Sequence, residues 1–281
     1  MTIVYHYCDA TAFLSIIESG VLRLTNARKT NDRRELEFFK EKAFEYVAEF
    51  AKEQESLETF HDALSFHFDL VEDLSEYHIC CLSTERDSVG QWVAYADKGA
   101  GFAIGFDINA LRLTVGAPIL DKDFAATPLE SAAGDWRFAP VIYGDDKNLR
   151  PHLDKILEFG RAQEGVEIGT TQPARDYINL MCAYFKHPAF RDEHEWRIIY
   201  DATRPVRLTK LLGQKNQPEI RWRYGKYGLT PYCETPNILS CIREIVVGPS
   251  NLDRETDSYI SQFLRSHAID AKIVKSECPY R

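Results

Sequence analysis

The sequence predicts an α+β fold in which a mainly antiparallel sheet is flanked by helices. Short stretches of period-2 alternation mark the strands, and amphipathic stretches with a period near 3.6 mark the helices. These stretches do not alternate strictly, as the strands and helices of a doubly wound parallel sheet do. The 281 residues, of which 44% are hydrophobic, can bury a sizeable core. We therefore expect a single α+β domain over residues 1–281.

The first expected unit is a strand followed by a helix. Residues Ile3 to Cys8 form a strand-like run, and Asp9 is suited to cap the N-terminus of the next helix. Gly20 supplies the residue at which that helix ends. Residues 21–24 then form a short extended piece.

Two long amphipathic helices come next. The residues Thr30-Asn31-Asp32 are expected to cap the first, which carries Phe39 on its apolar stripe, and the second carries Phe68. We expect these helices to form a helical-hairpin insertion at about residues 33–75, packed at the side of the sheet.

The remaining elements continue the mixture of strands and helices. Strands are expected at Ile79–Ser83, Phe102–Phe106, Arg137–Tyr143, Glu195–Tyr200, Ile242–Val247 and Ala271–Val274. Helices are expected after Ser88, from about Leu149, from Pro173 to Phe185, and after Asp253. The strands that begin at Ile3, Ile79, Phe102, Glu195 and Ile242 should belong to one sheet system.

Composition excludes several classes of protein. The longest apolar stretches are too short to span a bilayer, and no secretory signal precedes Ile3, so we expect a cytoplasmic protein with no membrane contact. The seven cysteines lack the spacing of a disulfide framework and are expected to be reduced thiols. No CxxC pair and no HExxH motif occurs, so we expect no metal site.

The net charge of −9 disfavours a broad surface that tracks phosphates. One segment, Arg221 to Tyr227, departs from this pattern because cations alternate there with aromatic residues. Such a segment is typical of a phosphate or nucleic-acid contact. The alternative, which we favour from the sequence, is a strand whose cationic side chains lie along apolar surface.

A few polar and aromatic residues interrupt the apolar pattern. His6 lies within the first strand, and Glu195 and Arg197 share one face of a later strand because side chains alternate along it. Trp92 and Tyr95 share one face of a short helix. Each of these residues also has a structural interpretation. His6 fits a core histidine, Glu195 fits a solvated strand edge, and Trp92 and Tyr95 fit core aromatic residues.

Small residues also line one face of an expected strand. Gly101, Ala103 and Gly105 would permit the close approach of a ligand or of another backbone, and simple packing under a helix is an equal alternative. The sequence contains no glycine-rich phosphate loop and no GxSxG nucleophile elbow.

Taken as a set, the motifs resemble a bacterial family known as domain of unknown function 2971. The motifs are Tyr5-His6-Tyr7, Leu14-x-x-Ile17-x-x-Gly20-Val21-Leu22, Thr30-Asn31-Asp32-x-x-Glu35, Cys81-Leu82-Ser83, Trp92-x-x-Tyr95-Ala96-Asp97, Gly101 to Phe106, Phe185-Lys186, Phe190, Glu193-x-Glu195-Trp196-Arg197 and Ser276-x-x-Pro279-Tyr280. The resemblance covers nearly the whole chain and implies a variable insertion at about residues 111–177. It names no activity.

The opening strand and the following Gly-Val-Leu are also similar to the start of DNA-targeting ADP-ribosyltransferases and RNA 2′-phosphotransferases. That resemblance implies an ADP-ribosyltransferase-like split sheet, with NAD as a substrate. It implies catalytic roles for His6, Tyr95 and Glu195. The implied contacts to NAD come from His6, Tyr7, Ser83, Trp92, Tyr95 and Arg197. The expected acceptor is a protein or a nucleic acid, as for a toxin or phage-defence effector, and an antitoxin or another partner protein would fit such a role.

Two other classes of function stay open from the residues alone. The first is a nucleic-acid hydrolase that uses Asp32, Glu35, Glu193 and Glu195 as acids or as ligands of a hard cation such as Mg²⁺. The second is a non-catalytic sensor or interaction protein whose polar residues only hold the fold.

Overall fold

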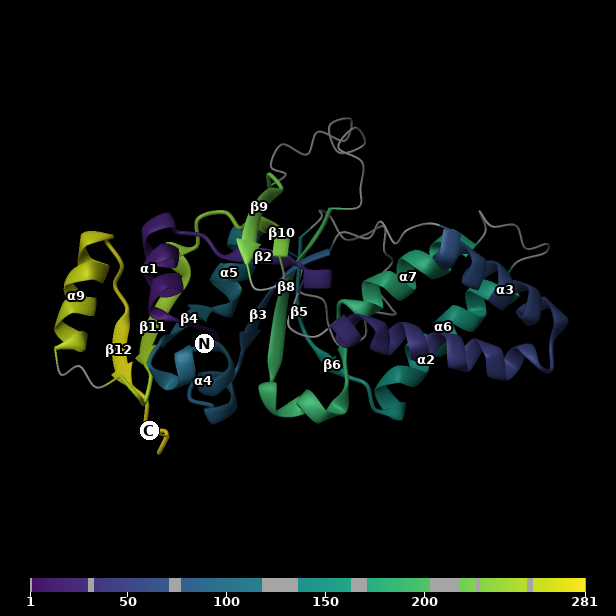
Figure 1. Cartoon of the computed structure of the whole chain (residues 1–281), viewed down its shortest axis with the longest axis horizontal. Helices are drawn as coiled ribbons and strands as arrows, with labels where there is room; N and C mark the ends of the chain where they lie inside the picture. Colours follow the sequence, from purple (N-terminus) through teal and green to yellow (C-terminus); the bar gives the residue numbers. More distant parts are fainter. Residues whose placement is uncertain are drawn as a thin grey trace.

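One mainly antiparallel sheet organises the chain, and helices cover its faces and one of its ends (Figure 1). The computed structural model describes residues 2–29, 33–70, 77–117, 136–162, 171–202, 218–225, 228–251 and 255–280, with only the backbone described for residues 33–36 and 70. Over these ranges the fold is α+β, as predicted. Among the described residues, no helix combines the length and the apolar character needed to cross a membrane.

Ten strands of the sheet lie in the described part of the chain, and they include the five that were predicted to share one sheet. Its main path runs in the order β12 (Lys272–Lys275), β11 (Ile242–Val247), β4 (Phe102–Asp107), β1 (Ile3–Cys8), β3 (Tyr77–Ser83), β2 (Arg23–Asn26), β10 (Gly228–Glu234) and β9 (Arg221–Gly225). Strand β8 (Glu195–Asp201) pairs with β3, and β5 (Trp136–Pro140) pairs with β8. Among the described strands of this sheet, β11 and β12 form the one parallel pair.

The strand expected at Arg137–Tyr143 is in fact two short strands. Strand β5 ends at Pro140, and β6 (Ile142–Tyr143) forms a separate parallel pair with β7 (Phe185–Lys186). Between them, the backbone N–H of Val141 donates to the carbonyl of Glu195. This break turns the chain from the main sheet toward the segment that carries Lys186.

The sheet forks at β3, and the fork creates the space that the site occupies. Strand β8 pairs with one edge of β3 along its whole length. Two strands share the other edge: β2 pairs opposite His78 and Ile79, whereas β1 pairs only where Tyr5 lies opposite Ser83. Residues 80–82 of β3 therefore lie between two diverging branches of the sheet.

The helices are α1 (Ala10–Ser19), α2 (Arg33–Ala51), α3 (Glu55–Leu70), α4 (Val89–Tyr95), α5 (Ile108–Val115), α6 (Asp146–Arg161), α7 (Gln172–Cys182) and α9 (Thr256–Ser266). The caps predicted for α1 are confirmed, since the Asp9 carboxylate accepts a hydrogen bond from the N–H of Ala12 at 2.7 Å and Gly20 has a φ of 72°. Ser88 precedes α4 without a side-chain capping bond. The caps expected at 30–32 and at Asp253 lie outside the described residues.

Two long segments of the chain build a common helical layer at one end of the sheet (Figure 1). Helices α2 and α3 come from the expected hairpin insertion, and they share one hydrophobic core with α6 and α7. The rings of Phe39 and Phe185 stack there with centroids 4.7 Å apart. This layer fixes the position of β7, which directly follows α7.

Gly101, just before β4, and Gly105, within it, leave room for neighbouring atoms of the chain rather than for a ligand: a backbone carbonyl at Gly101 and a side chain at Gly105. A Cβ atom on Gly101 would lie 2.2 Å from the carbonyl oxygen of Cys8, and one on Gly105 would lie 2.9 Å from the ring of Tyr5. Close packing between β4 and β1 therefore explains both glycines.

We expect Gly101→Ala to destabilise the fold markedly, because the backbone of β1 cannot move away without breaking its ladder with β4. A lower thermal midpoint of unfolding is the predicted result. The matched control is Gly90→Ala in α4, where the nearest atom would be 3.8 Å away and alanine favours the helix. If both variants unfolded at the wild-type temperature, the proposed packing constraint would be wrong.

Candidate functional site

A cavity of about 610 Å³ opens in the fork of the sheet. Its walls come from β1, β2, β3 and β8, from α1 and α4, from β7, and from the β9–β10 hairpin. The lining residues that matter below are Tyr5, His6, Tyr7, Arg23, Lys29, Cys80, Cys81, Tyr95, Lys186, Glu193, Glu195, Arg223 and Tyr224. A volume of this size suits a small-molecule or cofactor ligand.

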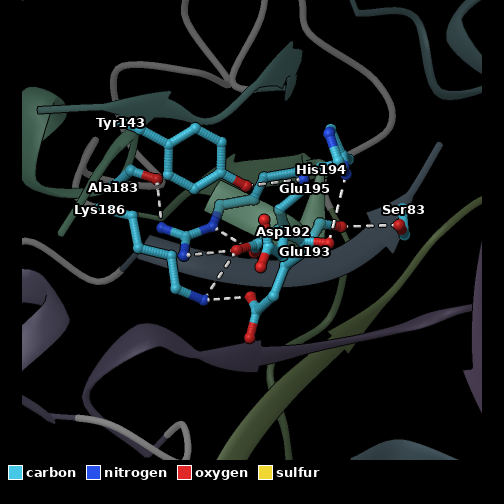
Figure 2. Close-up of polar contacts among 9 residues, drawn as sticks. Ser83, Tyr143, Ala183, Lys186, Asp192, Glu193, His194 and Glu195 are labelled. Atoms are coloured by element: carbon cyan, nitrogen blue, oxygen red, sulfur yellow. Dashed lines mark hydrogen bonds and ion pairs between the residues drawn. The ribbon is translucent and has the colours of Figure 1, made fainter. Parts of the chain in front are cut away.

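Glu195 lies at the start of β8 and is buried in a network of charges (Figure 2). Its carboxylate accepts hydrogen bonds from Arg197 Nε at 2.7 Å and Nη2 at 3.3 Å, and from Lys186 Nζ at 3.1 Å. The predicted shared face of Glu195 and Arg197 is confirmed by this contact. The Arg197 guanidinium also donates to the carbonyl of Ala183 at 2.8 Å, which ties β8 to the end of α7.

The charge state of Glu195 follows from these neighbours. Burial raises the pKa of its carboxyl, but the cations of Arg197 and Lys186 outweigh burial and lower the pKa to about 2. The Cys81 thiol adds a hydrogen bond that lowers it further. Glu195 is therefore a carboxylate at neutral pH, suited to stabilise positive charge and unsuited to donate a proton.

Lys186, part of a motif shared with the family that the chain resembles, is a cavity residue to which the sequence analysis gave no role. Its ammonium lies between two carboxylates, 2.5 Å from Glu193 and 3.1 Å from Glu195 (Figure 2), and its side chain is almost fully buried. A lysine directly after the apolar run from Met181 to Phe185 was the available signal, since lysine is rarely buried without a partner.

Glu193 differs from Glu195 in its exposure. Its side chain is 24% exposed and lines the cavity, whereas the side chain of Glu195 is 4% exposed. The backbone carbonyl of Glu193 accepts a hydrogen bond from the Ser83 hydroxyl at 2.7 Å. Glu193 thus presents the more accessible of the two carboxylates to a ligand.

His6 fills the gap where β1 and β3 separate. Its Nδ1 lies 3.1 Å from the carbonyl oxygen of Cys81, and burial lowers the pKa of the imidazole. A carbonyl only accepts, so the neutral ring carries its proton on Nδ1 and leaves Nε2 as an acceptor.

His6 and Glu195 line the same cavity but project from opposite faces of the sheet. Residues opposite one another in antiparallel strands share a face, so Tyr5, Ser83 and Glu195 lie on one face. His6, one residue from Tyr5, lies on the other. Cys81 connects the two because its carbonyl contacts His6 while its thiol contacts Glu195.

Tyr95 and Tyr7 line the cavity in different ways. Tyr95, at the end of α4, is 39% exposed, and burial together with the nearby Glu193 raises the pKa of its phenol. The Tyr7 hydroxyl is already engaged, since it donates to the carbonyl of Glu85 and accepts from the N–H of Ser88. Tyr95 is therefore the aromatic ring more open to a ligand.

Three residues expected to contact NAD lie behind the cavity wall instead of lining it. Ser83 is buried and bonds the Glu193 backbone, and Trp92 is fully buried with its Nε1 donating to Asp87 at 2.6 Å. Arg197 is also buried and reaches Glu195 from behind. All three support residues that line the cavity.

The described residues contain no group of three or more His, Cys, Asp or Glu side chains that could hold a metal ion. Asp32 and the side chain of Glu35, which the hydrolase hypothesis requires, lie outside the described part of the chain. That hypothesis therefore stays a prediction.

The shifted pKa values predict that stability rises with pH across the acidic range. Between pH 4.5 and about 2, the Glu195 carboxyl is protonated in the unfolded chain but still ionised in the folded one. Below pH 6.5, the His6 imidazole likewise takes up a proton in the unfolded chain before it does so in the folded one. Each contribution is thus complete above the unfolded pKa and is lost as pH falls toward the folded one. For Glu195 the loss is on the order of 3 kcal/mol. Denaturant titrations from pH 7 to 2.5 should show a shallower acid loss in Glu195→Gln than in the wild type, and parallel curves would contradict the assignment.

Residues 91–198 match the model of a family described as "Protein of unknown function (DUF2971)". No curated protein and no solved structure matches the chain. The matched segment begins in α4 and ends in β8, so it includes Tyr95, Lys186, Glu193 and Glu195. This match supports the resemblance to the domain of unknown function 2971 family.

Proposed function

We propose that the protein uses NAD as a substrate and transfers ADP-ribose to an acceptor. One observation carries the proposal: His6, Tyr95 and Glu195, which are far apart in the sequence, line a single cavity. The cations of Arg23 and Arg223 also line the cavity and suit the two phosphates of NAD.

The ionised Glu195 fits the chemistry of this transfer. When the nicotinamide–ribose bond breaks, nicotinamide leaves with the bonding electron pair and positive charge develops on the ribose carbon. A fixed carboxylate lowers the energy of that charge. The acceptor then forms the new bond to the same carbon and gives up its proton to solvent.

The other cavity residues would position the substrate. The Nε2 of His6 can accept a hydrogen bond from a ribose hydroxyl, and the exposed ring of Tyr95 can stack on the nicotinamide. Glu193, as the more exposed carboxylate, can orient the acceptor. The cavity therefore provides a group for each part of the reaction.

A second candidate is a ligand-binding protein without catalysis. The Glu195 carboxylate already accepts bonds from Arg197, Lys186 and Cys81, an arrangement that also suits a purely structural ion network. Such a protein would bind a nucleotide in the same cavity without consuming it.

The first experiment is calorimetric titration of the protein with NAD. We expect saturable binding that Tyr95→Ala weakens by roughly two- to tenfold, because stacking is lost, and that His6→Ala also weakens. The matched control is Val93→Ala on the same helix, since Val93 is 44% exposed and does not line the cavity. Absence of saturable binding, or equal weakening by Val93→Ala, would remove the proposal.

A further inference from the structure

The β9–β10 hairpin carries an exposed aromatic surface. Strand β9 is the last strand of its branch, and all five of its residues are exposed. The hairpin lies above the fork of the sheet in the view of Figure 1. The strand favoured from the sequence is confirmed, and Arg223 lies against the ring of Tyr232, but the aromatic residues of β9 are exposed.

The register of the hairpin separates its side chains by chemistry. Tyr224 lies opposite Leu229, and Trp222 lies opposite Pro231, so these four residues share one face. Trp222, Tyr224 and Leu229 are 61%, 87% and 58% exposed. This face, which we call the aromatic face, has no covering element among the described residues.

The arginines lie on the opposite face of β9. Arg221 donates to Glu234 at 2.7 Å, and Arg223 donates to Thr25 at 2.8 Å and lies 5.7 Å from the ring centroid of Tyr232. Arg223 and Tyr224 also line the cavity, together with Arg23 and Lys29 of the neighbouring branch. Cationic side chains therefore lie in the cavity wall next to Tyr224, which belongs to the aromatic face.

We propose that the β9–β10 hairpin binds a single-stranded nucleic acid, whose bases stack on the aromatic face and whose backbone passes around the open edge of β9 to the arginines on the other face, beside the cavity. Exposed rings on alternate residues can stack on unpaired bases, and the intervening cations can meet the backbone that joins those bases. A duplex hides the faces of its bases and does not offer this contact.

Charge complementarity favours this partner and confines it to the hairpin. The chain as a whole carries a net charge of −9 and repels a polyanion. Arg23, Lys29 and Arg223 line the cavity, and Arg221 lies two residues from Arg223 on the same face of β9. Glu219 contacts Arg221, and Glu234 contacts both Arg221 and Arg23. A strand bound there would place one of its bases at the cavity. That this nucleic acid is the acceptor rests on the proposed transfer of ADP-ribose. That the hairpin binds it does not depend on that transfer.

The test is the anisotropy of a fluorescent twelve-nucleotide single strand, measured with the whole chain and without NAD. We expect the double variant Trp222→Ala, Tyr224→Ala to bind at least about tenfold more weakly, because two stacking platforms are lost. The control is Tyr259→Ala, since Tyr259 is about as exposed as Trp222 (59% against 61%) but lies on α9, which packs against β12 at the other end of the sheet (Figure 1). It should bind as the wild type does.

Salt dependence separates stacking from general attraction. Arg223→Gln should reduce the slope of log K against log salt by about 0.7, whereas the aromatic variant should leave the slope unchanged. A duplex of the same length should bind at least tenfold more weakly than the single strand. Equal affinity for duplex and single strand, or wild-type binding by the aromatic variant, would overturn the proposal.

Sedimentation of the wild type and of the same variants tests whether a second copy of the chain, rather than a nucleic acid, covers the aromatic face. We expect the wild type and the aromatic variant to share one oligomeric state. A wild-type dimer that the aromatic variant loses would instead identify the face as an interface between copies. A chain that binds the single strand but does not consume NAD would support the nucleic-acid surface and contradict the proposed transferase activity. A chain that consumes NAD but does not bind the single strand would support the transferase activity and contradict the surface.

Discussion

A Glu195→Gln variant should lose at least about a hundredfold in the rate of NAD turnover. Glutamine keeps the shape of the side chain but removes the fixed negative charge that stabilises the ribose cation, and loss of such a group costs on the order of a hundredfold or more. The measurement is single-turnover release of nicotinamide at saturating NAD. Binding of NAD should remain within a fewfold of the wild type.

Stability must be separated from catalysis in this variant, because Glu195 also balances the buried charges of Arg197 and Lys186. The matched control is Arg197→Leu, which disturbs the same network but leaves the carboxylate in the cavity. Both variants should be assayed well below their unfolding temperatures. If Glu195→Gln lost turnover only in proportion to its loss of folded molecules, while Arg197→Leu kept wild-type activity per folded molecule, the role of Glu195 would be structural.

Arg197→Leu should lower the free energy of unfolding by about 3–5 kcal/mol, the range expected when one partner of a buried ion pair is removed. The change takes away a two-nitrogen contact to Glu195 and the hydrogen bond to Ala183 that holds β8 against α7. Denaturant unfolding measures this loss.

The comparison is Arg191→Gln, which removes a surface ion pair with Asp145 whose two side chains are about half exposed. That variant should change stability by less than about 1 kcal/mol. Similar losses in both variants would contradict a special role for the buried network.

Local patterns in the sequence predicted most of the elements and the shared face of Glu195 and Arg197. A strand has a side-chain period of two, so residues two apart point the same way whatever the strand pairs with. The caps of α1 were likewise predictable, because Asp9 and Gly20 act within a single turn.

The arrangement of the site depended on pairings that no local pattern contains. The single register between Tyr5 and Ser83 creates the fork and sends His6 to the face opposite Glu195. Lys186 reaches Glu195 only because β7 lies against the helical layer. Trp92 and Ser83 interrupt apolar patterns, as residues of a site do. In the structure, however, Trp92 donates its hydrogen bond to Asp87 and Ser83 donates to the carbonyl of Glu193, so neither polar atom faces the cavity.

The most direct test of the central claim is incubation of the wild-type chain with NAD labelled on its adenylate. The account predicts release of free nicotinamide, with an equal amount of label appearing on an added single-stranded oligonucleotide or as free ADP-ribose when no acceptor is present. Glu195→Gln should release nicotinamide no faster than buffer alone. Equal rates for wild type and Glu195→Gln, or intact NAD after prolonged incubation with a folded wild-type chain that binds it, would contradict the account.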